Sequence, residues 1–146
     1  MSAVAFADVA PGVVLPPLVK MPTRAQLVQY AGAADDFSPI HFDDGHARAR
    51  GFESVIVHGL LKAAFLGELL ESWSAARRGW VQSMRTEYRG VDLPGAPLVC
   101  RAEVESATVD GATGTAELSL WIERADGTIS TRGSATVRFD LAEEAV

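Results

Sequence analysis

The chain has 146 residues, of which 48% are hydrophobic, with a formal net charge of −6 and an isoelectric point near 5.0. Phosphate binding requires a basic face that releases counterions, so this acidic balance argues against a nucleic-acid-binding protein. The richest apolar stretch, residues 60–73, carries charged side chains and is too short to cross a bilayer, so we expect no membrane partner. A chain of this size predicts one domain, residues 1–146, whose core needs no disulfide.

Two features of the sequence bear on cellular location. Cys100 is the single cysteine, so it forms no internal disulfide and no thiolate metal cluster, which favours a reducing compartment. Residues 1–7 lack the basic region of a signal peptide, and Asp8 follows before any long apolar stretch. We therefore expect a cytoplasmic protein.

The first predicted elements are an extended segment and a short helix. Residues 13–20 are apolar but contain two prolines, which permits an edge strand or an extended arm and excludes a central strand. Thr23 is a good N-cap for a short amphipathic helix over residues 24–34. The apolar face of this helix consists of Leu27, Val28 and Ala31.

A polar loop and a long apolar helix follow. Residues 35–52 predict an ordered loop with a short helix over residues 44–50, which Gly51 ends. Residues 60–73 then form a helix that is apolar almost all round. Such a helix in a soluble protein is buried on most sides, as when a curved sheet wraps around it.

The second half of the sequence is strand-like throughout. The predicted strands cover residues 81–88, 98–108, 115–123 and 128–139. The turn dipeptides Asp110-Gly111 and Asp126-Gly127 are suited to two-residue hairpins. Alternation of apolar residues along 116–122 favours an antiparallel sheet with one buried face. The pattern therefore predicts an α+β fold in which a curved antiparallel sheet wraps around a long central helix.

Asp36 and His41 form the candidate catalytic pair, five residues apart across Pro39. The proline prevents a continuous helix and pushes Ser38 toward an extended conformation, so the chain can bring both side chains to one pocket. A carboxylate and an imidazole held together can share one water, one removing its proton while the other donates a proton. From the residues alone, the alternative is that Asp36 caps a turn and His41 is a structural, partly buried histidine.

The sequence around this pair resembles a known family. Residues 36–47, which read DFSPIHFDDGHA, resemble the hydratase-2 motif of the MaoC-like (R)-specific enoyl-CoA hydratases and 3-hydroxyacyl thioester dehydratases. Residues 51–61 are similar to the segment that opens the family's central helix, and residues 89–98 resemble its proline-glycine connection between strands. The likeness covers nearly the whole chain and implies the hot-dog fold. The sequence departs from the family at Asp35, where glycine is usual, and at Ser38, where asparagine is usual.

The resemblance implies a reaction and a set of site residues. Asp36 and His41 would bind and activate the catalytic water, and the backbone N–H of Gly59 would stabilise the thioester oxygen. The first turn of a helix suits a developing enolate, because its N–H groups are unpaired and its dipole is positive there. The reaction would interconvert trans-2-enoyl and (3R)-3-hydroxyacyl thioesters without a cofactor. The candidate substrate-binding residues are Ser38, His58 and Phe65.

Other interpretations stay open for several residues. The alternative role of Gly59 is purely structural, in helix entry or close packing. The alternative role of His58 is likewise structural packing. Candidate gates of an acyl tunnel along the central helix, each also compatible with ordinary core, are Phe37, Phe52, Phe65 and Trp80. The spacing of Asp43, Asp44 and His46 is unlike a zinc ligand set, so we expect no metal site. The arginines within residues 77–89 form either a solvated face or a site for a pantetheine or nucleotide phosphate; they are Arg77, Arg78, Arg85 and Arg89.

The sequence leaves two alternative functions open and predicts a partner subunit. A hot-dog acyl thioesterase is disfavoured by the spacing of Asp36 and His41, and a noncatalytic acyl-binding subunit is disfavoured by the intact pair. One curled sheet leaves an open edge strand, so we expect a homodimer, or a heterodimer with another hot-dog subunit. The expected substrate is an acyl-CoA or acyl-ACP thioester.

Overall fold

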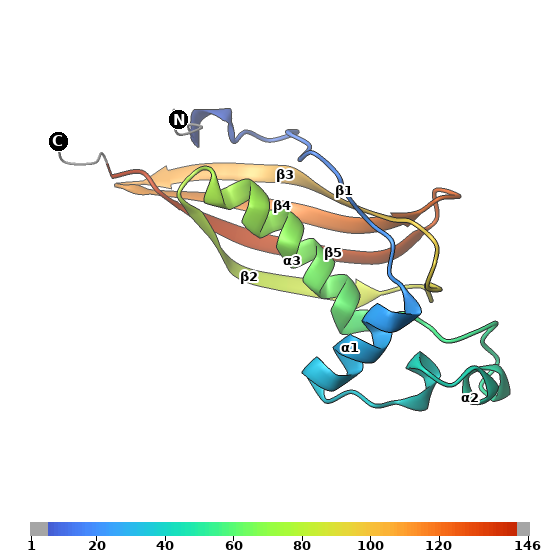
Figure 1. The fold of residues 1–146 in the computed structure, drawn as a ribbon. Helices are drawn as coiled ribbons and strands as arrows, with labels where there is room; N and C mark the ends of the chain where they lie inside the picture. Colours follow the sequence, from blue (N-terminus) through green and yellow to red (C-terminus); the bar gives the residue numbers. More distant parts are fainter. Residues whose placement is uncertain (1–5, 143–146) are drawn as a thin grey trace.

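A five-stranded antiparallel sheet forms the main layer of the computed structural model, which describes residues 6–142 (Figure 1). The strand order is β1-β3-β4-β5-β2, so β1 and β2 are the two edges. The strands are β1 (Leu18–Lys20), β2 (Gly79–Tyr88), β3 (Leu98–Asp110), β4 (Thr113–Arg124) and β5 (Ile129–Asp140). The segment with two prolines thus contributes an edge strand, as predicted.

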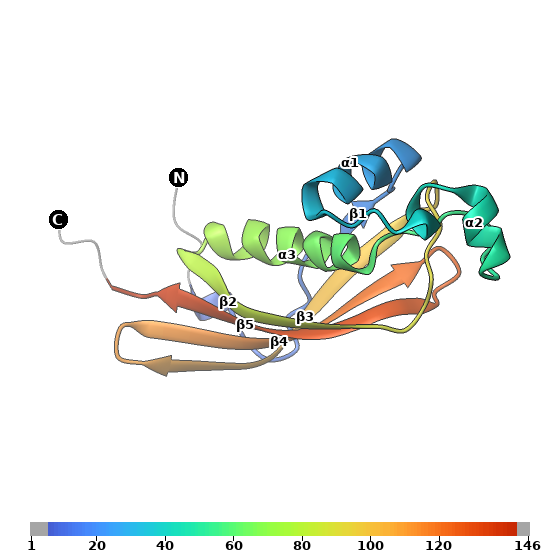
Figure 2. The ribbon, with the colours of Figure 1, turned by 90° about the horizontal axis from the view of Figure 1, so that it is seen from below.

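Helix α3 (Gly59–Ala75) lies along one face of the sheet and forms the core with it (Figure 2). Leu66 and Leu70 of the helix are fully buried, as are Leu118 and Ile122 on the inner face of β4. Buried and less buried residues alternate along β4 because successive side chains of a strand point to opposite faces. Burial of each large apolar side chain contributes about 1.5–3 kcal/mol. The structure confirms the predicted α+β arrangement of a sheet around a long helix.

Glycines with positive φ close the two hairpins of the sheet. Gly111 has φ of 57° in the two-residue loop 111–112 between β3 and β4. The loop between β4 and β5 spans residues 125–128, so the prediction of a two-residue turn was wrong there. The carboxylate of Asp126 accepts a hydrogen bond from the N–H of Thr128 at 2.8 Å, which stabilises a wider turn with Gly127 at φ 82°.

Helix α1 (Arg24–Ala34) covers the end of the molecule at which α3 begins (Figures 1 and 2). Thr23 caps it as predicted, because its hydroxyl accepts from the N–H of Gln26 at 3.1 Å. Leu27 and Ala31 are buried, whereas Val28 is exposed. The apolar face of α1 is therefore narrower than the sequence indicates.

Two short helical segments follow, η2 (Pro39–His41) and α2 (Asp44–Ala49), and α2 ends before Gly51 as predicted. Asp43 caps α2 by accepting from the N–H of His46 at 3.0 Å. Asp44 pairs with Arg24 and also accepts from the N–H of Val55 at 3.0 Å. These carboxylates therefore hold the loop in place. Within residues 6–142, α3 and the other helices are too short or too polar to cross a bilayer.

Candidate active site

The loop between α1 and α3 brings Asp36 and His41 together. Asp35 ends α1 in the left-handed conformation, at φ 53°, and turns the chain out of the helix one residue before Asp36. This conformation explains why glycine suits the position. Pro39 then opens η2, whose last residue is His41. The N–H of the partly buried Ser38 donates to Oδ1 of Asp36 at 3.3 Å, and Oδ2 of Asp36 lies 3.8 Å from Nε2 of His41.

A backbone carbonyl fixes the orientation of the His41 ring. Nδ1 of His41 lies 2.7 Å from the carbonyl oxygen of Ile56, which only accepts, so Nδ1 carries the proton. In the neutral ring Nε2 then has the lone pair and faces the carboxylate of Asp36. Two acceptors 3.8 Å apart do not bond to each other, but both can accept a hydrogen bond from one water. The side chain of Asp36 is 41% exposed and that of His41 is 8% exposed, so the pair opens outward on the aspartate side.

His58, the N-cap of α3, packs directly against this pair and is fully buried. Its ring stacks on that of His41, with centroids 3.7 Å apart and planes at 19°, and its Nε2 lies 3.4 Å from the carbonyl oxygen of Asp36. Burial, together with the neighbouring His41, lowers the pKa of His58. Because the His58 side chain is fully buried, its position does not favour the predicted contact with substrate. Its position favours a contact within the loop that carries Asp36 and His41.

Asp36, His41 and His58 each place a possible ligand atom within 4.8 Å of the others. A transition-metal ion, however, needs imidazole lone pairs that converge at about 2.0–2.1 Å. Two stacked rings 3.7 Å apart direct their in-plane lone pairs along nearly parallel planes. The geometry therefore suits proton transfer better than metal binding.

The burial of His58 predicts a loss of stability in mild acid. The ordinary pKa is 6.5, and the folded protein lowers it. As the pH falls below about 6.5, the unfolded chain binds a proton that the folded protein does not, so the free energy of unfolding decreases. In urea unfolding, we expect His58→Phe to lose less stability than the wild type between about pH 7.5 and about pH 5.5. The control His46→Gln should keep the wild-type loss. An equal loss in His58→Phe would show that His58 is not the group that titrates.

Gly59, the first residue of α3, follows His58 directly. Its N–H lies in the first helical turn, where helical hydrogen bonding supplies no acceptor. A Cβ at this position would lie 3.0 Å from the ring of Tyr88, so glycine lets this exposed tyrosine at the end of β2 pack against the helix. The ring of Tyr30 packs edge-on against that of His58, with centroids 4.9 Å apart, and burial together with Tyr88 and Asp36 raises the pKa of Tyr30. The site thus includes two tyrosines that the sequence analysis did not single out.

The aromatic candidates for acyl gates lie at different distances from the pair. Phe37 is exposed beside Asp36. Phe65 is buried in the core six residues beyond Gly59, about 9 Å along α3. Trp80 is exposed and precedes Tyr88 by eight residues, about 26 Å along β2. Trp80 is therefore too far from the pair to meet a short acyl chain.

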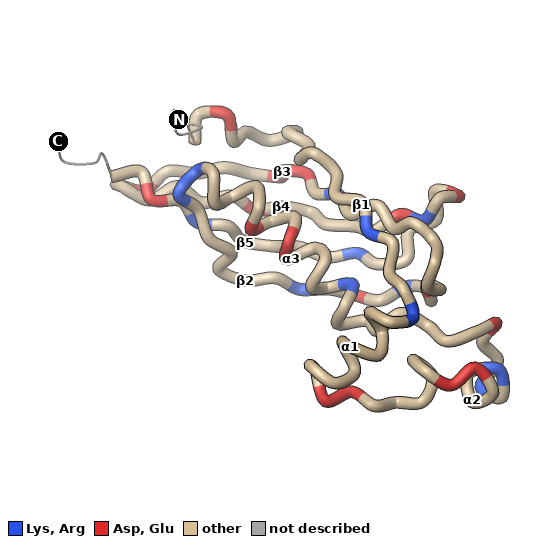
Figure 3. The backbone as a smooth tube through the Cα atoms, in the orientation of Figure 1, with Lys and Arg blue, Asp and Glu red and all other residues tan. Residues whose placement is uncertain are grey.

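The clustered arginines do not converge on one phosphate. Figure 3 shows basic residues at the turn after α3 and, separately, along β2. Arg77 packs on the ring of Trp73 at 5.1 Å, and Arg78 pairs with Asp140 at 2.7 Å. Arg78 lies in the turn before β2, whereas Arg85 lies six residues beyond the first residue of this strand, Gly79, about 20 Å along it. A phosphate site built from all of these arginines does not fit the structure.

Comparisons with known proteins identify similar chains. The (R)-specific enoyl-CoA hydratase of Aeromonas caviae is 24% identical over 115 residues, which cover 79% of this chain and 84% of that protein. The solved (R)-hydratase from A. caviae, described as involved in PHA biosynthesis, matches with a TM-score of 0.81 and 25% identity over 89% of this chain and 96% of its own. The ChsH1-ChsH2 complex from Mycobacterium tuberculosis contains a chain that matches with a TM-score of 0.77 and 19% identity, over 88% of this chain and 97% of its own.

These similarities define the class of protein. The sheet that curves around α3 has the hot-dog fold, as predicted. The A. caviae enzyme that the chain resembles is a hydratase, which belongs to the hydro-lyases. The family model described as MaoC like domain matches residues 12–122. The chain therefore belongs to the MaoC-like family, as the motif around Asp36 and His41 indicates.

Proposed function

We propose that this chain, as one domain over residues 1–146, hydrates trans-2-enoyl thioesters to (3R)-3-hydroxyacyl thioesters and catalyses the reverse reaction. The observation that carries the proposal is the pair of acceptors, Oδ2 of Asp36 and Nε2 of His41, 3.8 Å apart beside the first turn of α3. The similarity to the (R)-specific enoyl-CoA hydratase of A. caviae supports it.

The chemistry follows from this arrangement. A water that donates to both acceptors attacks C3 of the enoyl group with its oxygen, so one O–H bond breaks, a C3–O bond forms, and one acceptor takes the proton. Negative charge moves to the thioester oxygen, where the N–H of Gly59 donates a hydrogen bond. C2 then receives a proton from the pair, which returns the pair to its starting state. The product gains one hydroxyl at C3 and one hydrogen at C2, and no cofactor takes part.

The test is a direct assay of the purified chain with trans-2-enoyl-CoA and with the matching acyl-ACP thioester. We expect the absorbance of the conjugated thioester to fall without release of thiol, and chiral analysis of the product to show the (3R) alcohol. Release of thiol would instead identify a thioesterase. Binding without either signal would identify a noncatalytic subunit. The relative rates on the two carriers decide which of them the protein uses.

The position of Phe37 predicts an effect on chain-length preference. Phe37→Ala should shift turnover toward longer enoyl thioesters, since about 0.8 kcal/mol per buried methylene corresponds to about fourfold in rate for each added carbon. Phe65→Leu should act in the same direction if the acyl chain follows α3. Trp80→Ala should leave the profile unchanged because Trp80 lies at the far end of β2. A series of enoyl-CoA lengths measures these profiles, and unchanged profiles in both phenylalanine variants would place the acyl chain elsewhere.

We also propose that the chain pairs with a second hot-dog subunit through β2. This strand pairs with β5 on one side and forms the edge of the sheet on the other. Exposed edge strands tend to pair, and Trp80 adds exposed apolar surface there. The mass of the protein in solution, alone and with a candidate partner, distinguishes a homodimer from a heterodimer. We also propose a cytoplasmic location, with which a single cysteine that is free and buried, Cys100, is compatible.

A further inference from the structure

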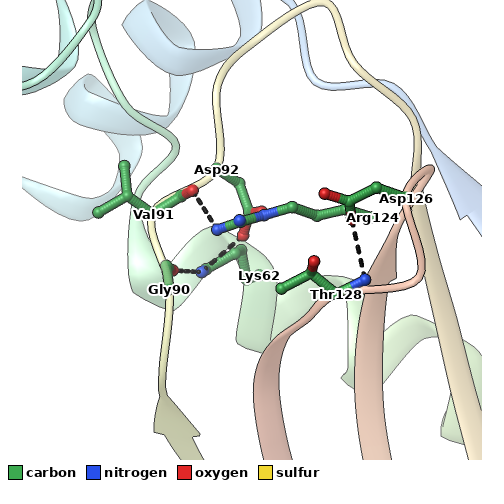
Figure 4. Close-up of polar contacts among 7 residues, drawn as sticks. All are labelled: Lys62, Gly90, Val91, Asp92, Arg124, Asp126 and Thr128. Atoms are coloured by element: carbon green, nitrogen blue, oxygen red, sulfur yellow. Dashed lines mark hydrogen bonds and ion pairs between the residues drawn. The ribbon is translucent and has the colours of Figure 1, made fainter.

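Helix α3 carries a buried lysine that belongs to an ion-pair network (Figure 4). Nζ of Lys62 donates to Oδ2 of Asp92 at 2.8 Å and to the carbonyl oxygen of Gly90 at 2.9 Å. Nε of Arg124, at the end of β4, donates to Oδ1 of Asp92 at 2.7 Å, and its guanidinium also donates to the carbonyl of Val91. The side chains of Lys62 and Asp92 are 3% and 1% exposed, whereas that of Arg124 is 31% exposed. The carboxylate of Asp92 is thus held at both oxygens.

Two cationic partners fix the side chain of Asp92 and keep it ionised. Burial by itself would raise the pKa of Asp92, but hydrogen bonds from Lys62 and Arg124 outweigh it and hold the pKa below its usual value. The carboxylate is therefore charged and clamped between two cations. Apolar residues of similar size often stabilise a core as well as a buried ion pair does. The clear consequence of the network is therefore that it fixes where Asp92 lies, including its main chain.

The main chain of Asp92 reaches His41 through a single peptide group. The carbonyl oxygen of Asp92 accepts from the N–H of Val57 at 2.8 Å. The same peptide group carries the carbonyl of Ile56, which accepts from Nδ1 of His41 at 2.7 Å. A peptide group is planar and rigid, so its N–H and its C=O must turn together. A hydrogen bond to the N–H also polarises the C=O and strengthens it as an acceptor.

We propose that Asp92, clamped by Lys62 and Arg124, is a positioning residue for His41. By fixing the peptide group between Ile56 and Val57, it keeps the proton of His41 on Nδ1 and the lone pair of Nε2 toward Asp36. Its kinetic consequence rests on the proposed hydratase function. Its structural consequence, the protonation pattern of the His41 ring, does not depend on that function.

The decisive variant is Lys62→Met/Asp92→Leu, which replaces the buried pair with apolar side chains of similar size. Such a replacement is expected to leave the protein folded. We expect kcat to fall about ten- to hundredfold, with KM changed by less than about threefold, because the pair is misaligned and substrate binding is not removed. In long-range ¹H–¹⁵N NMR spectra, neutral His41 should change from the single Nδ1–H tautomer to a mixture. The chain has 3 histidines, so single substitutions assign their signals.

The control is Glu68→Gln, which breaks an ion pair between α3 and Lys20, whose Nζ lies 2.6 Å from Oε2 of Glu68. It should leave kcat and the His41 tautomer unchanged. A folded double variant with wild-type kcat and a single tautomer overturns the proposal, even if its melting temperature is lower. Absence of hydratase activity in the wild type would refute the proposed function, and the NMR comparison would still decide this inference.

A second variant covers the case in which the double variant does not fold. Arg124→Gln removes one of the two clamps on Asp92, and the partly exposed position of Arg124 should tolerate the change. We expect kcat to fall about threefold to tenfold, with a partial change in the His41 tautomer. Wild-type kcat together with a wild-type tautomer in Arg124→Gln overturns the proposal.

Discussion

Asp36→Asn and His41→Ala are each expected to lower hydratase turnover by about two orders of magnitude or more, while the protein stays folded. In Asp36→Asn the amide oxygen keeps the hydrogen bond from the N–H of Ser38, so the NH2 group, which only donates, replaces Oδ2 and a water can no longer donate to both members of the pair. His41→Ala removes Nε2, the other acceptor, 3.8 Å from Oδ2 of Asp36. Turnover of an enoyl-CoA under saturating conditions measures both effects, and circular dichroism checks the fold.

The double variant distinguishes one shared task from two separate tasks. Residues that act on one water behave as a unit, so the double variant should be close to the worse single variant. Asp35→Asn is the matched control, since it makes the same chemical change at the adjacent, exposed position and asparagine tolerates the left-handed conformation there. Turnover near the wild-type value in either Asp36→Asn or His41→Ala would remove the proposed mechanism.

Local patterns in the sequence predict the elements well because those patterns report on near neighbours. The apolar run after Gly59 predicts α3, and the period-two alternation after Thr115 predicts a strand with one buried face. The proline between Asp36 and His41 indicates that the chain turns between them. The β4–β5 loop was harder to predict because the side chain of Asp126 stabilises a wider turn than its dipeptide suggests.

Contacts between distant residues account for what the sequence did not predict. Lys62 stands out as a lone charge in the first turns of an apolar helix, but its partner Asp92 is 30 positions away. Arg124 lies a further 32 positions along the chain, at the end of β4, and the three meet only where α3 packs beside the connection between β2 and β3. The contact between Gly59 and Tyr88 likewise depends on where β2 ends. Periodicity carries no information on such pairings.

Gly59→Ala is expected to lower kcat/KM about hundredfold without lowering the free energy of unfolding. The added methyl would lie 3.0–3.1 Å from the ring of Tyr88, which is exposed enough to move aside. Alanine also loses less backbone entropy than glycine does when it enters a helix. The methyl, however, occupies the space beside the N–H that the thioester oxygen must reach, and loss of one such donor costs about 100- to 1,000-fold.

Two further variants separate the possible causes of that loss. In Gly59→Ala/Tyr88→Ala the methyl has room, so recovery of kcat/KM would mean that displacement of the tyrosine caused the loss. We expect no recovery, because the methyl itself keeps the thioester oxygen from the N–H.

Gly67→Ala is the matched control on the same helix, since a Cβ there would meet nothing within 4 Å in residues 6–142. It should raise stability slightly and leave turnover unchanged. Steady-state kinetics and urea unfolding measure these effects, and wild-type kcat/KM in Gly59→Ala would remove Gly59 from the proposed oxyanion site.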